Sequence, residues 1–62
     1  MRKFMRKIVI FDEAEDAIEE AMFSADQENT PYAIVDYYGQ FGVCPYKSVR
    51  SNDTVLELVN RT

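Results

Sequence analysis

The sequence has no histidine and only one cysteine among its 62 residues. Without histidine, Ser–His and Cys–His nucleophilic catalysis and imidazole metal sites are excluded. Cys44 on its own can form neither an internal disulfide nor a cysteine-based zinc site, and its neighbour Pro45 does nothing to activate the thiol. We therefore expect Cys44 to fill the core, and we expect a protein that is not an enzyme and binds no metal or cofactor.

Glycine and long hydrophobic runs are also scarce. The two glycines, Gly39 and Gly42, provide neither a P-loop nor a G-x-G-x-x-G motif. The apolar run 8–11 is far shorter than a signal-peptide core, which needs about 7–15 residues, or a membrane span, which needs about 20. We expect a cytoplasmic protein without membrane contact, and a single thiol agrees with a reducing compartment.

Positive charge is missing from the whole middle of the chain. No lysine or arginine occurs between Lys7 and Lys47, and this stretch carries nine of the eleven acidic residues. The formal net charge of −4 therefore hides a strong local negative field. Such a field governs the choice and the steering of partners rather than the fold.

The length indicates one domain, which we expect to span 1–62 with residues 1–5 frayed or extending the first strand. A chain of this size buries only about 60% of the surface that its unfolded form exposes. Small domains of this kind often gain further burial by oligomerising or by binding a partner.

Residues 12–28 have the period of an amphipathic helix. Its small and apolar residues fall within an arc of about 140°: Ala14, Ala17, Ile18, Ala21, Met22 and Ala25. Asp12 is the expected N-cap, with Glu15 completing a capping box. Asn29 and Pro31 are expected to end the helix, because asparagine tolerates the left-handed conformation and proline cannot continue the helix.

The other segments have the composition of strands. The continuous apolar run within residues 6–11 predicts a central strand. Residues 32–38 and 41–46 predict a hairpin that turns at Gly39-Gln40, with Pro45 at an edge or a bulge.

The C-terminal segment 54–59 favours a fourth strand, although Asp53 could instead cap a short helix. The resulting order is β-α-β-β-β. We therefore predict an α+β fold of two layers, with one amphipathic acidic helix packed on a small sheet of three to four strands.

The outer face of this helix is the first candidate site. It combines six acids with one aromatic residue: Asp12, Glu15, Asp16, Glu19, Glu20, Phe23 and Asp26. Carboxylates a few ångströms apart resemble the phosphates of a duplex, and Phe23 could anchor a contact that the charges steer. We predict a binding site for a protein with a basic surface. The simpler interpretation is a solvated face, with Phe23 packed on the loop after the helix.

The sheet face that the helix leaves uncovered is the second candidate. The aromatic and aliphatic residues that could line it for a partner are Tyr32, Ile34, Tyr37, Tyr38, Phe41 and Tyr46. A face of this kind exceeds what monomers usually expose. The alternative function is therefore a structural dimerisation or assembly domain, in which a second copy covers this face. The simpler interpretation is that sheet twist and the terminal segments cover it.

A third hypothesis is a binder of single-stranded nucleic acid. Basic residues cluster in 2–7, and Tyr37, Tyr38 and Phe41 could stack on bases. The acidic helix would repel phosphates, however, so we do not expect direct binding of nucleic acid.

In size, acidity and lack of catalytic groups, the chain resembles small accessory proteins encoded by phages and mobile elements, including DNA-mimicking inhibitors. The likeness is one of overall profile and assigns no residue. It implies an acidic inhibitor or modulator of a nucleic-acid-handling protein, which is also the function that we favour from the residues.

Overall fold

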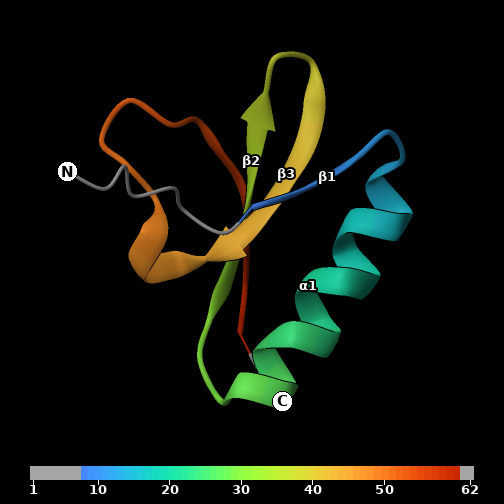
Figure 1. The fold of residues 1–62 in the computed structure, drawn as a ribbon, viewed down its shortest axis with the longest axis vertical. Helices are drawn as coiled ribbons and strands as arrows, with labels where there is room; N and C mark the ends of the chain where they lie inside the picture. Colours follow the sequence, from blue (N-terminus) through green and yellow to red (C-terminus); the bar gives the residue numbers. More distant parts are fainter. Residues whose placement is uncertain (1–7, 61–62) are drawn as a thin grey trace, which may run out of the picture.

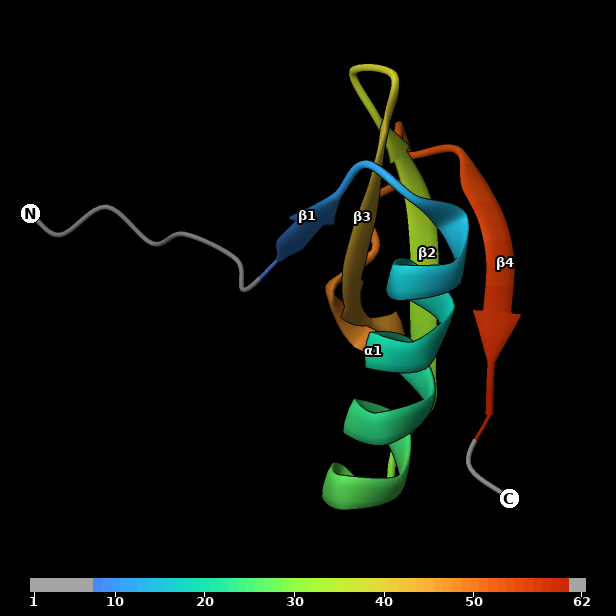
Figure 2. The same cartoon turned by 90° about the vertical axis from the view of Figure 1, so that its right-hand side faces the viewer.

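The structure, a computed structural model, describes residues 8–60 (Figure 1). Its elements are β1 (Val9–Phe11), α1 (Ala14–Glu28), β2 (Tyr32–Tyr37), β3 (Gln40–Pro45), the 3-10 helix η1 (Tyr46–Ser48) and β4 (Val55–Val59). The four strands form one antiparallel sheet of order β1-β3-β2-β4, and α1 packs on one of its faces (Figure 2). The predicted two-layer α+β fold is confirmed, and 54–59 contributes a strand rather than a helix.

The position of β1 differs from the prediction. Among the described strands, β1 pairs only with β3, from Val9↔Val43 to Phe11↔Phe41, and is therefore an edge strand. The prediction of a central strand was wrong because the β2–β3 hairpin places β3 between β1 and β2. Both neighbours of β3 are antiparallel to it, so β1 and β2 run parallel. The predicted fraying or extension of residues 1–5 lies outside the described residues.

The N-terminal end of α1 differs from the sequence prediction, whereas its C-terminal end agrees with it. The N-cap is Glu13, without a side-chain hydrogen bond, so the capping box predicted at Asp12 does not form. The Asp12 carboxylate instead accepts a hydrogen bond from the side-chain amide of Gln40, at the start of β3. At the other end, Asn29 adopts the left-handed conformation with φ 59°, and its N–H donates to the Ala25 carbonyl, as predicted.

The hairpin turns one residue earlier than predicted. Tyr37 pairs with Gln40, so the two turn residues are Tyr38 and Gly39, with φ of 53° and 85°. Two positive φ values are typical of the type I′ turn, whose twist matches that of the strands. The Gly39 N–H also donates to the Asp36 carboxylate at 3.2 Å. Gly39 therefore has the role predicted for it, but its turn partner is a tyrosine.

The main core lies between α1 and the sheet. Three alanines of the helix, Ala17, Ala21 and Ala25, are fully buried against four buried residues of the strands: Tyr32, Ile34, Val43 and Val59. Small side chains let the helix axis approach the sheet closely. The buried arc is narrower than predicted, because Ala14 is exposed and Ile18 and Met22 remain 40% and 51% exposed.

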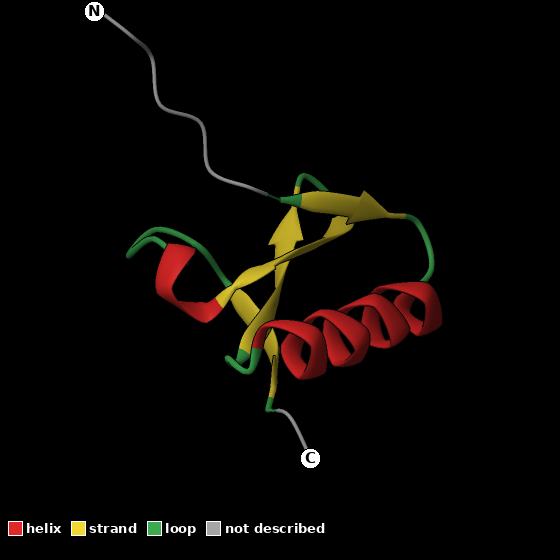
Figure 3. Ribbon diagram, turned by 60° about the horizontal axis from the view of Figure 1, so that its bottom comes forward, coloured by secondary structure: helices red, strands yellow, loops and turns green. Residues whose placement is uncertain are grey.

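The sheet face opposite α1 is also covered over its two central strands, β2 and β3. Side chains alternate along a strand, so Val35 and Cys44 point away from α1, yet both are fully buried. The η1 helix and the loop 49–54 lie on this side of the sheet (Figures 1 and 3). Ile8 lies over Gly42 so closely that a Cβ there would meet the Ile8 Cδ1 at 2.7 Å. The prediction of an uncovered face is therefore wrong for β2 and β3, whereas at β4 Val55 and Leu58 remain exposed. The buried position of Cys44 is confirmed.

Candidate functional site

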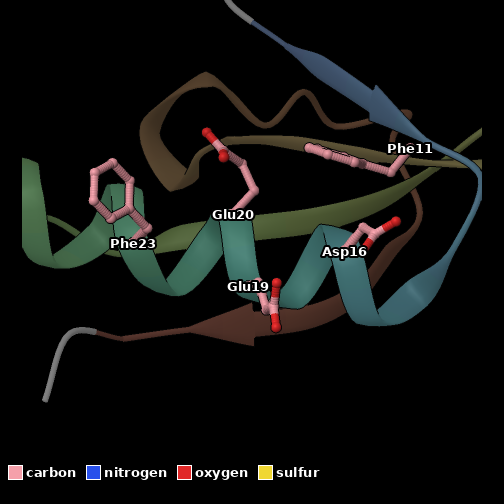
Figure 4. A pocket seen from close by; sticks show the side chains of 5 residues that line it. All are labelled: Phe11, Asp16, Glu19, Glu20 and Phe23. Atoms are coloured by element: carbon pink, nitrogen blue, oxygen red, sulfur yellow. The ribbon is translucent and has the colours of Figure 1, made fainter.

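One flank of α1 borders a shallow groove with a volume of about 360 Å³ (Figure 4). We call it the acidic groove, and its lining residues are Phe11, Asp16, Glu19, Glu20 and Phe23. Phe23 lies toward one end of the groove and Phe11 with Asp16 toward the other, with Glu20 between them. Two phenyl rings thus frame a run of carboxylates.

The groove follows from helical spacing and from the place of β1. Asp16, Glu20 and Phe23 are separated by four and three residues, so they lie along one side of α1. Phe11 ends β1, and only Asp12 and Glu13 connect it to the helix. Because β1 is an edge strand, its Phe11 ring packs partly on the core while its remaining surface borders the groove.

The aromatic ring of Phe23 is unusually exposed for a large apolar side chain. Its side chain is 63% exposed, so packing on the loop after the helix does not bury it. Phe11, by contrast, is partly buried against the main core. The groove therefore has one fixed apolar wall and one exposed apolar wall, and the exposed wall is available to a partner without rearrangement of the core.

The carboxylates of the groove lie far from the described bases. Glu20 accepts a hydrogen bond from the Ser24 hydroxyl at 3.1 Å, one turn along the helix. The bases within residues 8–60 are Lys47 and Arg50. They belong to η1 and the loop after it, on the side of the sheet opposite α1 (Figures 1 and 3). Within the described part of the chain, no base neutralises the groove.

The structure brings together four of the seven predicted helix-face residues. Asp16, Glu19, Glu20 and Phe23 line the groove. Glu15 and Asp26 are exposed farther around the helix, and Asp12 precedes it in contact with Gln40. Phe11 was not among the predicted site residues, because the apolar run that contains it was assigned to a central strand. Its position directly before the helix was the only signal that could have identified it.

The six predicted sheet-face residues do not share a face. Tyr32 and Ile34 are 3% exposed and belong to the core beneath α1, and Phe41 packs against the same core. Strand alternation is the reason: residues two apart in β2 point to one side, and α1 lies on that side.

The remaining three sheet-face candidates are scattered. Tyr37 points to the other side of the sheet and stacks edge-on against Tyr38, with ring centroids 4.8 Å apart. Tyr38 is 90% exposed in the hairpin turn, and Tyr46 is half exposed in η1. A continuous aromatic platform for bases or for a second copy is therefore not formed by these residues.

Tyr32 instead ties the end of α1 to β2. Its hydroxyl donates to the Glu28 carboxylate at 2.7 Å. Burial of the phenol, and then the hydrogen bond to Glu28 and its negative charge, raise the pKa of Tyr32 to about 12. The contact is structural, since the ring is buried beneath the helix.

Two further features are absent from residues 8–60. No group of three or more histidine, cysteine, aspartate or glutamate side chains there is arranged to hold a metal ion. Nor does that part of the chain contain a helix with the length and apolar character needed to cross a bilayer.

Comparisons with known proteins provide no further guide to this site. No protein-family model matches the chain, and neither a curated protein nor a solved structure matches it. The geometry of the described residues is therefore the basis for a functional proposal.

Proposed function

We propose that this chain is a small non-enzymatic binding module that inhibits or modulates a nucleic-acid-handling protein by occupying its basic surface. The observation that carries the proposal is the acidic groove, which three carboxylates line together with the rings of Phe11 and Phe23 (Figure 4). The segment 12–28 around it contains no base. We expect the protein to act in the cytoplasm, where its proposed targets lie and where the Cys44 thiol stays reduced.

The two components of the groove have different tasks in binding. The carboxylates attract a basic surface over a distance of about a Debye length, which raises the association rate. The rings of Phe11 and Phe23 then contact the aliphatic stems of lysine or arginine side chains, whose charged ends reach the carboxylates. Charge alone would give weak, unspecific association, whereas an exposed ring within the charged surface can act as a binding hot spot.

Occupation of a basic surface would exclude nucleic acid from it. Carboxylates spaced along one side of a helix present negative charge at intervals comparable to those of phosphates. A partner that binds phosphates without reading bases would therefore bind this face as well. Direct binding of nucleic acid by this chain is not proposed, because its phosphates would meet the same carboxylates.

The test starts with capture of partners from the native host's lysate on the immobilised chain, with elution by a salt gradient. We expect a nucleic-acid-binding protein that elutes at moderate salt and that added duplex DNA or RNA displaces. A partner without a basic surface, or one that nucleic acid does not displace, would contradict the proposal.

Matched charge variants of this chain, measured with the purified partner, then locate the contact. The double change Glu19→Lys with Glu20→Lys should weaken binding about 100-fold, because it reverses two charges inside the groove. The control is Glu15→Lys with Asp26→Lys, which changes the net charge equally on the same helix but outside the groove lining. Equal loss in both variants would show that net charge, rather than the groove, determines binding.

A further inference from the structure

The strand β4 forms the second edge of the sheet, and its surface is apolar. Four of its five residues are exposed. Val55, Leu56 and Leu58 keep 43%, 48% and 47% of their surface exposed. Among the described strands, β2 is its only neighbour. A strand edge of this kind presents a row of backbone groups that can pair with another chain.

The backbone hydrogen bonds of β2 show which of its residues face β4. The Tyr46 N–H donates to the Pro31 carbonyl at 3.0 Å, toward β3. The Asp36 N–H donates to the Thr54 carbonyl at 2.9 Å, toward β4. Because bonding direction alternates along a strand, the odd-numbered residues of β2 bond to β3 and the even-numbered residues bond to β4.

The same alternation identifies the outward groups of β4. Ile34 pairs with Glu57 and Tyr32 pairs with Val59, so the backbone groups of Glu57 and Val59 are used toward β2. Leu58 lies between them in the strand. Its N–H and carbonyl therefore point outward in the plane of the sheet, away from β2. Leu58 is at once an exposed apolar side chain and an outward-facing donor and acceptor.

Apolar side chains lie on both layers beside this edge. Val55 and Leu58 lie on the face of the sheet away from α1, since their β2 partners point there. Above the edge, Ile18 and Met22 lie on the flank of α1 opposite the acidic groove, and this flank faces β4 (Figure 2). We call the set Ile18, Met22, Val55, Leu56 and Leu58 the apolar edge.

We propose that β4 pairs antiparallel with β4 of a second copy of this chain, in a register centred on Leu58. The two four-stranded sheets then form one continuous sheet. In this register, the outward N–H and carbonyl of Leu58 in each copy exchange hydrogen bonds, and Glu57 lies opposite Val59 of the second copy. A register centred on Glu57 would place two carboxylates opposite each other and would need backbone groups already bonded to β2.

A second copy fits this edge because the apolar edge is self-complementary. A two-fold axis at Leu58 places both helices on the same side of the joined sheet, with Ile18 and Met22 of one copy facing those of the other. The acidic grooves lie on the opposite flanks of the helices, so they stay apart and exposed. The inference thus does not rest on the proposed function.

The size of the contact predicts its strength. Five half-exposed side chains supply less than the roughly 800 Å² per partner of a standard interface. We therefore expect a dimer that forms and dissociates in the micromolar range rather than a permanent one.

The first test is sedimentation equilibrium from low micromolar to millimolar concentration. The wild-type chain should pass from monomer to dimer. Leu58→Pro removes the outward N–H but no bond of the β2–β4 ladder, so it should weaken dimerisation at least about 10-fold more than Leu58→Ala, which keeps the N–H. A wild-type monomer at millimolar concentration, or equal effects of the two variants, would overturn the proposal.

Two further variants keep the test decisive if circular dichroism shows that Leu58→Pro does not fold. Ile18→Glu with Met22→Glu changes only exposed positions of α1 and should give a monomer. Leu58→Cys should form an intermolecular disulfide on mild oxidation, because hydrogen-bonded antiparallel partners have Cα atoms about 5.5 Å apart. Glu57→Cys is the matched control, and cross-linking of it as fast as Leu58→Cys would refute the register. An unrelated protein bound at this edge, with no dimer, would likewise refute the proposal.

Discussion

The two flanks of α1 come from one helix but offer opposite chemistry. The flank toward β1 carries the acidic groove, with Asp16 and Glu20 beside two phenyl rings. The flank toward β4 carries Ile18 and Met22, which remain about half exposed above an apolar strand. Both flanks are present because the alanine stripe that packs on the sheet is narrow. The residues beside that stripe are left at the surface, and charge and apolar area separate to its two sides.

Loss of the alanine stripe should remove both flanks together, and it is the largest effect that we expect. Ala21 is fully buried between α1 and the sheet. Ala21→Leu should destabilise the fold by about 1–3 kcal/mol, because added volume forces the helix away from the strands. Urea denaturation measures this change, with the exposed Ala14→Leu as the control, expected to stay within about 0.5 kcal/mol. Similar values for both variants would show that close packing at Ala21 does not hold the helix.

Substitution of single exposed residues should separate the two flanks. Phe23→Ala removes the exposed wall of the acidic groove and should weaken partner binding by about 2 kcal/mol, while dimerisation is unchanged. Met22→Ala, one residue away on the opposite flank, should weaken dimerisation and leave partner binding unchanged. Binding assays and sedimentation on the same two proteins measure both quantities. If either variant changed both partner binding and dimerisation, the two flanks would not be independent.

The hairpin turn lies outside both flanks and offers a stabilising change. Tyr38 occupies the left-handed conformation with φ 53°, which costs a non-glycine residue about 1–2 kcal/mol. Tyr38→Asn should raise the free energy of unfolding by about 1 kcal/mol, because asparagine before glycine suits a type I′ turn. Thermal denaturation tests this, and neither partner binding nor dimerisation should change. A lower melting temperature would indicate that the Tyr37–Tyr38 ring contact outweighs the backbone strain.

The last effect that we expect is confined to alkaline conditions and is a loss of stability at high pH. The pKa of Tyr32 is raised to about 12 in the folded chain, against about 10 when unfolded. The folded state therefore holds this proton more tightly, so the contribution to stability is complete below pH 10 and is lost as the pH rises toward 12. Denaturation across this range should show the loss in the wild-type chain but not in Tyr32→Phe. Parallel curves for the two proteins would contradict the assignment to Tyr32.

Much of the fold could be predicted from local chemistry. The helix end at Asn29, the hairpin glycine and the strand at 54–59 depend on residues close in sequence, and each was confirmed. The capping box failed because Gln40, distant in sequence, takes the Asp12 carboxylate. The turn register slipped by one residue for a similar reason, since strand pairing outweighs the poor fit of a tyrosine with positive φ.

The residues of the candidate sites also divide into those that the local sequence predicts and those that depend on distant segments. Phe23 stands out in sequence as an aromatic residue among acids, and its exposure agrees with that pattern. Phe11 and the apolar edge could not be predicted, because a short run of apolar residues has the same sequence pattern in a central strand and in an edge strand. The tyrosines were wrongly assigned to one open face of the sheet. The strand register determines the face on which each tyrosine lies, and it could not be predicted from the sequence.

By itself, the sequence determined the element order, the acidic helix and the absence of histidine chemistry, because these depend on composition and on spacing within one segment. The tertiary structure alone decided that β1 and β4 are the edges, that Phe11 and Asp16 line the same groove, and that Leu58 points its backbone groups outward. The reason is physical: strand order and register are properties of pairing between distant segments. Each residue's local preference is compatible with either side of the sheet.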